Sequence, residues 1–190
     1  MIITKTPYRI SLFGGGTDYP EWYTKYGGEV ISTTIDKYIY ISVRELPPFF
    51  DHKHRIVYSK IENVKKTNQI KFDLIKKAIL HHAIKEGMEI HYDGDLPAKS
   101  GMGSSSSFTV GILNAFSSYR NKEISKKDLA NKSIFFEQKI LKETVGIQDQ
   151  ISATFGGFNK IDIEKNGTFK IKKIKIDKNI KNFNNNLILL

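Results

Sequence analysis

The sequence predicts a single domain of the α+β class, because strand-like and helix-like patterns occupy separate stretches of the chain. Residues 30–44 alternate β-branched and aromatic side chains with polar ones, which is typical of a half-buried strand. Residues 104–119 instead repeat apolar side chains three or four positions apart, which is the spacing of one helix face. A length of 190 residues, of which 39% are hydrophobic, allows one large core, and no repeat or linker divides the chain.

The first half of the chain is predicted to be mostly strand, interrupted by turns. Gly14-Gly15-Gly16 ends the first strand-like stretch, and Pro47-Pro48 ends the long alternating one. A short helical turn is expected at 21–26 and a longer helix at 74–85. Strands are expected at 2–4, 8–13, 30–44, 56–61 and 89–92, and the third of these supplies one or two strands.

The second half is predicted to be mostly helical. Serines open the helix at 104–119 as candidate N-caps, and Ser125 is a candidate N-cap for a second helix at 125–142. A third helix is expected at 147–155, where apolar side chains lie one turn apart and two glycines follow. Lysine and isoleucine alternate over 170–176, which predicts the exposed face of a strand or hairpin.

Thirty Lys and Arg residues against twenty Asp and Glu give a formal net charge of +10, which favours an anionic partner. These basic residues are spread along the chain, so phosphorylated small molecules are favoured as partners and no nucleic acid is expected. The absence of cysteine excludes disulfides, thiolate metal sites and cysteine nucleophiles. Since no apolar stretch approaches the ~20 residues of a membrane span and no signal peptide is present, a cytoplasmic protein with no membrane partner is expected.

The motif most specific for a chemical function is the Gly/Ser-rich segment 97–107, which lies between a predicted strand and a predicted helix. Glycines let the backbone approach an anion, free N–H groups and the helix dipole attract it, and hydroxyls add donors or a Mg²⁺ ligand. A flexible linker has a similar composition, but a linker does not run directly into a long amphipathic helix. The segment therefore predicts a phosphate site, although it lacks the Gly-Lys-Ser/Thr of a Walker A loop.

Three spaced segments resemble motifs of the GHMP kinases, a family that includes galactokinase, homoserine kinase and mevalonate kinase. Pro97-x-x-x-Gly101-Met102-Gly103-Ser104-Ser105 is similar to the nucleotide-phosphate motif of the family, with methionine in place of leucine. Residues 7–19 are similar to its first motif, with Gly15-Gly16 where galactokinases carry Glu-His. Residues 145–150 and the two glycines that follow at 156–157 are similar to its catalytic-aspartate segment.

Within the family, the D-glycero-α-D-manno-heptose 7-phosphate kinases are the group that the chain resembles most. The stretches that carry this likeness are Phe13-Gly14-Gly15-Gly16-Thr17-Asp18-Tyr19-Pro20, Ser32-Thr33-Thr34-Ile35-Asp36-Lys37-Tyr38, Pro47-Pro48-Phe49-Phe50-Asp51-His52 and Gln148-Asp149-Gln150. The resemblance covers residues 1 to about 160, with three motifs in the family's order and spacing.

The resemblance implies a role for each matching residue. Asp149 is implied as the base for a sugar hydroxyl, and Arg9 as the group that stabilises the transferring phosphoryl or orients Asp149. Ser105 and Glu137 are implied as Mg²⁺ ligands, since a hydroxyl and a carboxylate are hard oxygen donors. Sugar hydroxyls are expected on Gly16, Thr17 and Asp18. The ATP phosphates are expected on Pro97, Lys99, Ser100, Gly101, Met102, Gly103, Ser104 and Ser105.

From the residues alone, other interpretations remain open. Glu137 fits a solvated helix face, Asp149 a surface carboxylate, and Arg9 a strand-edge arginine in an ion pair. Residues 17–18 fit a turn after three glycines. The basic segment 51–55 is interpreted as an exposed turn, in preference to a grip on a distal phosphate of the substrate.

The resemblance implies the GHMP kinase N-terminal fold (ribosomal protein S5 domain 2-like), a mixed β-sheet with helices packed on one face. Residues 1–180 are expected to form this ATP-binding domain, and 181–190 to begin a C-terminal domain missing from the chain. The implied activity is phosphorylation of the anomeric hydroxyl of D-glycero-α-D-manno-heptose 7-phosphate by Mg·ATP. The product is the 1,7-bisphosphate, for nucleotide-activated heptose synthesis. Alternatives are another sugar 1-kinase acting on fucose or a hexose, a truncated inactive domain that binds nucleotide or sugar phosphate, and a basic nucleic-acid binder.

Overall fold

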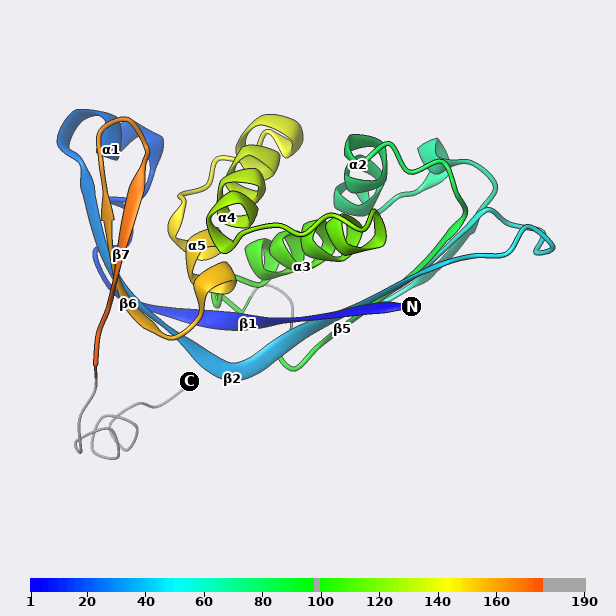
Figure 1. Cartoon of the computed structure of the whole chain (residues 1–190), viewed down its shortest axis with the longest axis horizontal. Coiled ribbons are helices and arrows are strands. Elements are labelled where there is room, and N and C mark those ends of the chain that lie inside the picture. Colours follow the sequence, from blue (N-terminus) through cyan, green and yellow to red (C-terminus); the bar gives the residue numbers. More distant parts are fainter. Residues whose placement is uncertain (98–99, 176–190) are drawn as a thin grey trace.

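The computed structural model describes residues 1–97 and 100–175, which form a mixed sheet with helices on one face (Figure 1). The long strands β1 (Ile2–Phe13) and β2 (Gly28–Glu45) pair antiparallel along most of their length. The first part of β2 also pairs with β6 (Phe158–Ile163), and its last part pairs with β5 (Met88–Gly94). β2 is therefore the central strand that joins the two ends of the sheet.

The outer strands complete the order β4-β3-β5-β2-β6-β7, with β1 on β2 outside this path. Both β3 (His54–Val57) and β5 run in the same direction, whereas the other pairs are antiparallel, so the sheet is mixed. This path ends at β4 (Ile61–Val64) and β7 (Phe169–Lys173), whereas β1 lies along the other side of β2.

The helical layer is built around α3 (Ser104–Tyr119), which packs against β1 and β2 and against its neighbouring helices. These neighbours are α2 (Asp73–His81), α4 (Lys126–Phe135) and α5 (Gln148–Phe155). These helices all pack on the same face of the sheet, as Figure 1 shows. Both Ile39 and Ile41 of β2 are fully buried beneath this layer, together with Phe116 of α3.

Three shorter elements complete the fold. The helix α1 (Pro20–Tyr26) lies beside the β6–β7 hairpin in Figure 1, away from the helical layer. A 3₁₀ helix, η1 (Thr67–Gln69), precedes α2. The π-helix η2 (Phe136–Leu141) continues α4 directly, and this rare helix type is often found at functional sites.

The predicted α+β class, the mixed sheet and the single helical face are all confirmed. The helix at 104–119 has the predicted bounds, and Ser125 caps α4 by accepting a hydrogen bond from the Asp128 N–H at 3.1 Å. The predicted boundary at residue 181 lies outside the described residues. Among the described residues, no helix is both long and apolar enough to cross a membrane.

Several element predictions were wrong in detail. The two strands expected at 2–4 and 8–13 form one strand, because the pairing with β2 continues through a register shift. The single strand expected at 56–61 is instead the end of β3, the hairpin turn at 58–60 and the first residue of β4. The helix expected at 74–85 ends at His81, where Ala83 takes a positive φ of 50° and the chain turns towards β5.

Candidate active site

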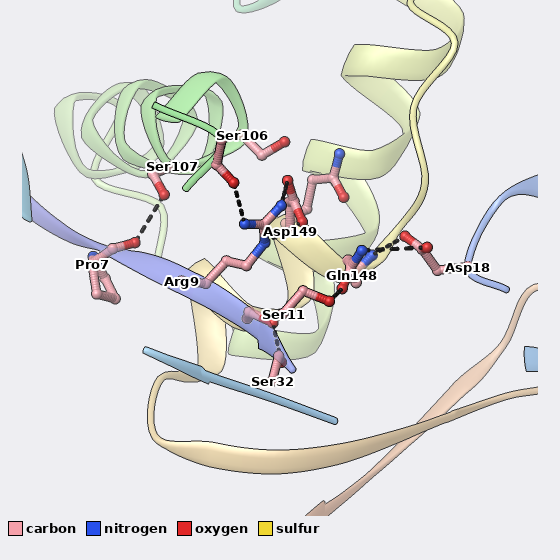
Figure 2. A network of polar contacts seen from close by, with 12 residues as sticks. Pro7, Arg9, Ser11, Asp18, Ser32, Ser106, Ser107, Gln148 and Asp149 are labelled. Atoms are coloured by element: carbon pink, nitrogen blue, oxygen red, sulfur yellow. Dashed lines mark hydrogen bonds and ion pairs between the residues drawn. The ribbon is translucent and has the colours of Figure 1, made fainter. Parts of the chain in front are cut away.

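A partly buried arginine–aspartate pair lies between β1 and α5, and the sequence places its two members 140 residues apart. The Arg9 guanidinium donates from Nε to Asp149 Oδ1 at 2.6 Å and from Nη2 to Oδ2 at 2.8 Å (Figure 2). The side chains are only 12% and 23% exposed, respectively. Burial raises the pKa of the Asp149 carboxyl above its ordinary value, while the adjacent Arg9 charge opposes that rise.

The Gly/Ser-rich loop reaches this pair from the other side. The Arg9 Nη1 group donates to the Gly101 carbonyl at 2.8 Å, and the Arg9 backbone N–H donates to the Met102 carbonyl at 3.1 Å. A Cβ atom placed on Gly103 would lie 3.3 Å from Asp149 Oδ2 and 3.2 Å from Arg9 Cγ. The loop, the arginine and the aspartate therefore meet at Gly103.

The same loop leaves the N-terminus of α3 without a side-chain cap. Its N-cap residue is Gly103, which has a φ of 71° and no side chain to accept from the first N–H groups. Ser107 anchors this first turn to β1 by donating from Oγ to the Pro7 carbonyl at 2.8 Å (Figure 2). An uncapped 16-residue helix whose first turn is fixed next to a glycine loop can accept an anion.

The remaining residues predicted for the phosphate loop take different positions. Ser100, Gly101 and Ser105 are exposed, whereas Met102 is 8% exposed and packs into the core. Pro97 is exposed just before the gap, and Lys99 lies outside the described residues.

Glu137 is fully buried at the start of η2, so the solvated-face interpretation of this residue was wrong. Its Oε2 atom accepts a hydrogen bond from Ser106 Oγ at 2.9 Å and another from Gln150 Nε2. Its Oε1 atom is buried and has no hydrogen-bond partner within 1–97 and 100–175. Burial raises the pKa of Glu137 to about 7, although the surrounding donors oppose this rise.

This carboxylate fits one part of a Mg²⁺ site. An unpartnered carboxylate oxygen beside a serine hydroxyl in the first turn of α3 is a hard-oxygen donor set. Within 1–97 and 100–175, no three His, Cys, Asp or Glu side chains gather around one point, but protein-bound Mg²⁺ usually takes most ligands from phosphate and water. The serine that contacts Glu137 is Ser106, whereas the predicted ligand Ser105 is an exposed residue.

The first glycine-rich loop places its three predicted residues in unequal surroundings. Gly16 is exposed, with open space where a Cβ would project. Thr17 turns its hydroxyl inward and donates to the Gly14 carbonyl at 2.7 Å. Asp18 is 1% exposed and accepts hydrogen bonds from the Gly16 N–H and the Gln148 N–H, both at 3.1 Å.

Gln148, Gln150 and Ser106 join the site although the sequence did not single out their roles. Gln148 accepts a hydrogen bond from Ser11 Oγ at 2.8 Å, and Figure 2 shows it between Ser11 and Asp18. Sequence spacing places the two glutamines on either side of Asp149, and that was the available signal. No comparable signal distinguishes Ser106 within a run of four serines, because only the helix start decides which hydroxyl turns inward.

An apolar cavity of about 560 Å³ opens beside the same helix terminus. Aromatic rings of β5, α3 and the loops around them form much of its wall, and Ser104 and Ser105 form the edge towards the glycine loop. Its lining is Tyr58, Ser59, Phe72, Leu74, Tyr92, Gly94, Leu96, Ser104, Ser105 and Phe108. Four separate elements contribute to this wall, so no local sequence pattern could reveal it.

The basic segment 51–55 lies at the opposite end of the sheet. In the register of the sheet, Arg55 of β3 pairs with Glu89 of β5, which pairs with Arg44 of β2. Arg9 pairs with Thr34, which lies ten residues before Arg44 on β2. At about 3.3 Å per residue this is roughly 33 Å of strand. A sugar phosphate cannot span this separation, so the structure opposes the interpretation as a grip on a distal phosphate. The exposed-turn interpretation fits 51–53 but was wrong for the rest, because His54 and Arg55 begin β3 and His54 is fully buried.

Comparison with known proteins gives one family match. Residues 72–157 match the family described as GHMP kinases N terminal domain. The D-glycero-alpha-D-manno-heptose 7-phosphate kinase of Campylobacter jejuni is 31% identical over 185 residues, covering 92% of this chain and 54% of that protein. The galactokinase of Pyrococcus furiosus is 29% identical over 189 residues, covering 94% of this chain and 51% of that protein.

Solved structures show the same likeness. The crystal structure of a D-glycero-D-manno-heptose 1-phosphate kinase from Bacteroides thetaiotaomicron matches with a TM-score of 0.82 and 27% identity. The match covers 94% of this chain and 61% of that one. The chain therefore spans between half and three fifths of the length of these three relatives.

Proposed function

The chain carries the N-terminal domain of the GHMP kinases, and on this premise we propose that it phosphorylates a sugar with ATP. The acceptor in this proposal is the anomeric hydroxyl of D-glycero-α-D-manno-heptose 7-phosphate, and the product is the 1,7-bisphosphate for nucleotide-activated heptose synthesis. In this proposal the described residues belong to the ATP-binding domain, and the boundary expected at residue 181 lies outside them. The meeting of Arg9, Asp149 and the glycine loop at Gly103 is the observation that carries the proposal.

In this reaction Asp149 takes the proton of the sugar hydroxyl. The deprotonated sugar oxygen then forms a bond to the γ-phosphorus of ATP. The bond from that phosphorus to the bridging oxygen of the β-phosphate breaks, and ADP leaves. Each Asp149 oxygen accepts one hydrogen bond from Arg9 and keeps a second lone pair for the proton. The raised pKa of the Asp149 carboxyl favours its action as a base, because a more basic carboxylate holds the proton better.

Arg9 has two tasks in this arrangement. Its bidentate contact fixes the rotamer of Asp149, and its charge lies beside the glycine loop, where negative charge spreads over the transferring phosphoryl group. Lysine cannot replace it in both tasks, because an ammonium group lacks the planar fork that binds two carboxylate oxygens at once.

The phosphates of ATP fit the open first turn of α3, and the nucleobase fits the apolar cavity beside it. Ser104 and Ser105 line that cavity and also belong to the phosphate loop, so one ligand reaches both. Flat aromatic walls suit a base, which stacks on rings such as Tyr92 and Phe108. When bound, Mg²⁺ would neutralise phosphate charge, and Glu137 with a serine hydroxyl of α3 would hold it.

The test is ADP release by this chain with Mg·ATP and a panel of acceptors: the heptose 7-phosphate, fucose, galactose and mevalonate. The proposal expects the highest kcat/KM with the heptose 7-phosphate. A preference for an unphosphorylated sugar would identify another sugar 1-kinase instead. No turnover, together with ATP binding that Ser105→Ala abolishes, would show a nucleotide-binding domain without catalysis. This outcome would be informative because the chain covers only about half of the length of each of these two curated relatives.

The same assay assigns the metal-binding serine. Ser105→Ala and Ser106→Ala remove one hydroxyl each from neighbouring positions, and only Ser106 contacts Glu137. If Ser106 holds the metal with Glu137, its variant needs more Mg²⁺ for half-maximal rate, while Ser105→Ala shows the wild-type Mg²⁺ dependence. The opposite ranking would assign the metal to Ser105.

A further inference from the structure

Asp18 is a buried carboxylate whose partners belong to a distant segment of the chain. Its Oδ2 atom accepts a hydrogen bond from the Gln148 N–H at 3.1 Å, and Oδ1 accepts from the Gly16 N–H at the same distance. The Gln148 side chain adds a longer contact from Nε2 to Oδ1 at 3.4 Å. The Asp18 carbonyl also accepts from the Ile147 N–H at 3.1 Å.

These contacts place a negative charge at the N-terminus of α5. This helix has no side-chain cap of its own, because its N-cap residue is Ile147. Asp18 supplies the missing acceptor from 130 residues away, and a carboxylate is favourable at the positive end of a helix. The packing is close, since a Cβ atom on Gly146 would lie 1.9 Å from Asp18 Oδ2.

The first turn of α5 that Asp18 holds is also the turn that carries Asp149. Figure 2 shows Asp18 and Arg9 on opposite sides of this turn, with Gln148 next to Asp18 and Asp149 next to Arg9. Arg9 fixes the side chain of Asp149, whereas Asp18 fixes the backbone one residue earlier. Displacement of this turn would move the Asp149 carboxylate away from the glycine loop.

We propose that Asp18 is a positioning residue for Asp149, acting through the α5 backbone, and that it does not bind the sugar. The proposal rests on the proposed function, in which Asp149 is the base. With 1% exposure and both oxygens hydrogen bonded to the protein, Asp18 has no free surface for a sugar hydroxyl. Its charge adds a second effect, because the nearby Asp18 carboxylate contributes to the raised pKa of Asp149.

The test compares Asp18→Asn with the wild-type chain by carboxyl and amide NMR. Among the residues that the structure describes, the charged groups that act on Asp149 are Arg9 and Asp18, so loss of the Asp18 charge leaves the arginine. Asp149 is then expected to titrate at lower pH, and the Gln148 amide proton to move upfield as its hydrogen bond weakens. An unchanged Asp149 titration and an unmoved Gln148 amide would overturn the proposal.

Steady-state kinetics separate positioning from sugar binding. Asp18→Asn is expected to lower kcat about ten- to a hundredfold and to leave KM for the sugar unchanged, because a small displacement of a catalytic group has this effect. A raised sugar KM with unchanged kcat would show that Asp18 binds the substrate and would overturn the proposal. Asp93→Asn is the matched control, since it removes one negative charge from an exposed position on β5.

A second variant covers the case in which Asp18→Asn does not fold. Asp18→Glu keeps the charge but has a longer side chain, so it is expected to retain the Asp149 titration while kcat falls. Wild-type kcat in Asp18→Glu would count against a positional role. If the wild-type chain turns over no acceptor, the proposed function fails, yet the titration and amide shifts still decide whether Asp18 holds Asp149.

Discussion

Gly101 and Gly103 offer a matched pair of substitutions in the glycine loop. Both have a positive φ, 73° and 71°, which L-residues with a side chain rarely adopt. Alanine at either position therefore carries a backbone strain of about 1–2 kcal/mol. They differ in their surroundings. A Cβ on Gly101 meets none of the described residues within 4 Å, whereas one on Gly103 meets Arg9 Cγ at 3.2 Å and Asp149 Oδ2 at 3.3 Å.

This difference predicts unequal effects on catalysis. Gly101→Ala and Gly103→Ala are expected to lose similar stability in urea unfolding, about 1–2 kcal/mol each, because the strain is shared. Only Gly103→Ala places a methyl group against the arginine–aspartate pair. We expect this methyl group to displace the Asp149 carboxylate by a few tenths of an ångström up to 1 Å, which lowers kcat by about ten- to a hundredfold relative to Gly101→Ala.

The assay is ADP release at saturating ATP, with ATP affinity measured separately by calorimetry. The two variants should bind ATP with similar affinity, since both glycines belong to the same loop, and differ in kcat. Equal kcat in the two variants, at equal stability, would refute the claim that the loop contacts the catalytic pair at Gly103.

Three further predictions follow from buried groups and from the cavity. Because burial raises the pKa of Glu137 from 4.5 to about 7, wild-type stability should fall by about 3 kcal/mol as pH rises through that window. Urea unfolding of Glu137→Gln should not show this fall, although the variant should lose its response to Mg²⁺. Because burial lowers the pKa of His54 from 6.5 to about 4, its contribution is complete above pH 6.5. About 2 kcal/mol of this contribution to the free energy of unfolding should be lost between pH 7.5 and pH 5. The loss is measured as the change with pH in the stability difference between the wild type and His54→Gln, and a difference that stays constant would contradict it. Tyr92→Ala should weaken ATP binding about tenfold in calorimetry and leave sugar KM unchanged, whereas Tyr40→Ala, outside the cavity, should leave both unchanged.

Local patterns predicted the elements whose signals are local. The apolar spacing of 104–119 and the N-cap Ser125 are properties of short segments, and both were confirmed. The strand β6 was missed, because its pairing with β2 joins residues 125 to 135 positions apart in sequence. The π-helix η2 was missed as well, since it continues the helical pattern of α4 and differs only in hydrogen bonding.

The candidate site shows the same division. The structure brings Arg9, Asp149 and the glycine loop into contact, and the resemblance to family motifs placed them in one site although no local rule brings 9, 101 and 149 together. The sequence could not indicate that Glu137 is fully buried, because the helix periodicity around it is weak. It also could not distinguish a sugar contact at Asp18 from a helix cap, since both need the same carboxylate and only the fold places Gln148 beside it.

The central claim, that Asp149 acts as the base in phosphoryl transfer from ATP, is tested most directly by Asp149→Asn. The measurement is ADP release with Mg·ATP and the heptose 7-phosphate, alongside ATP affinity by calorimetry. We expect turnover by the wild-type chain, and a loss of at least about a hundredfold in the variant with ATP affinity unchanged. Wild-type turnover in Asp149→Asn would contradict it.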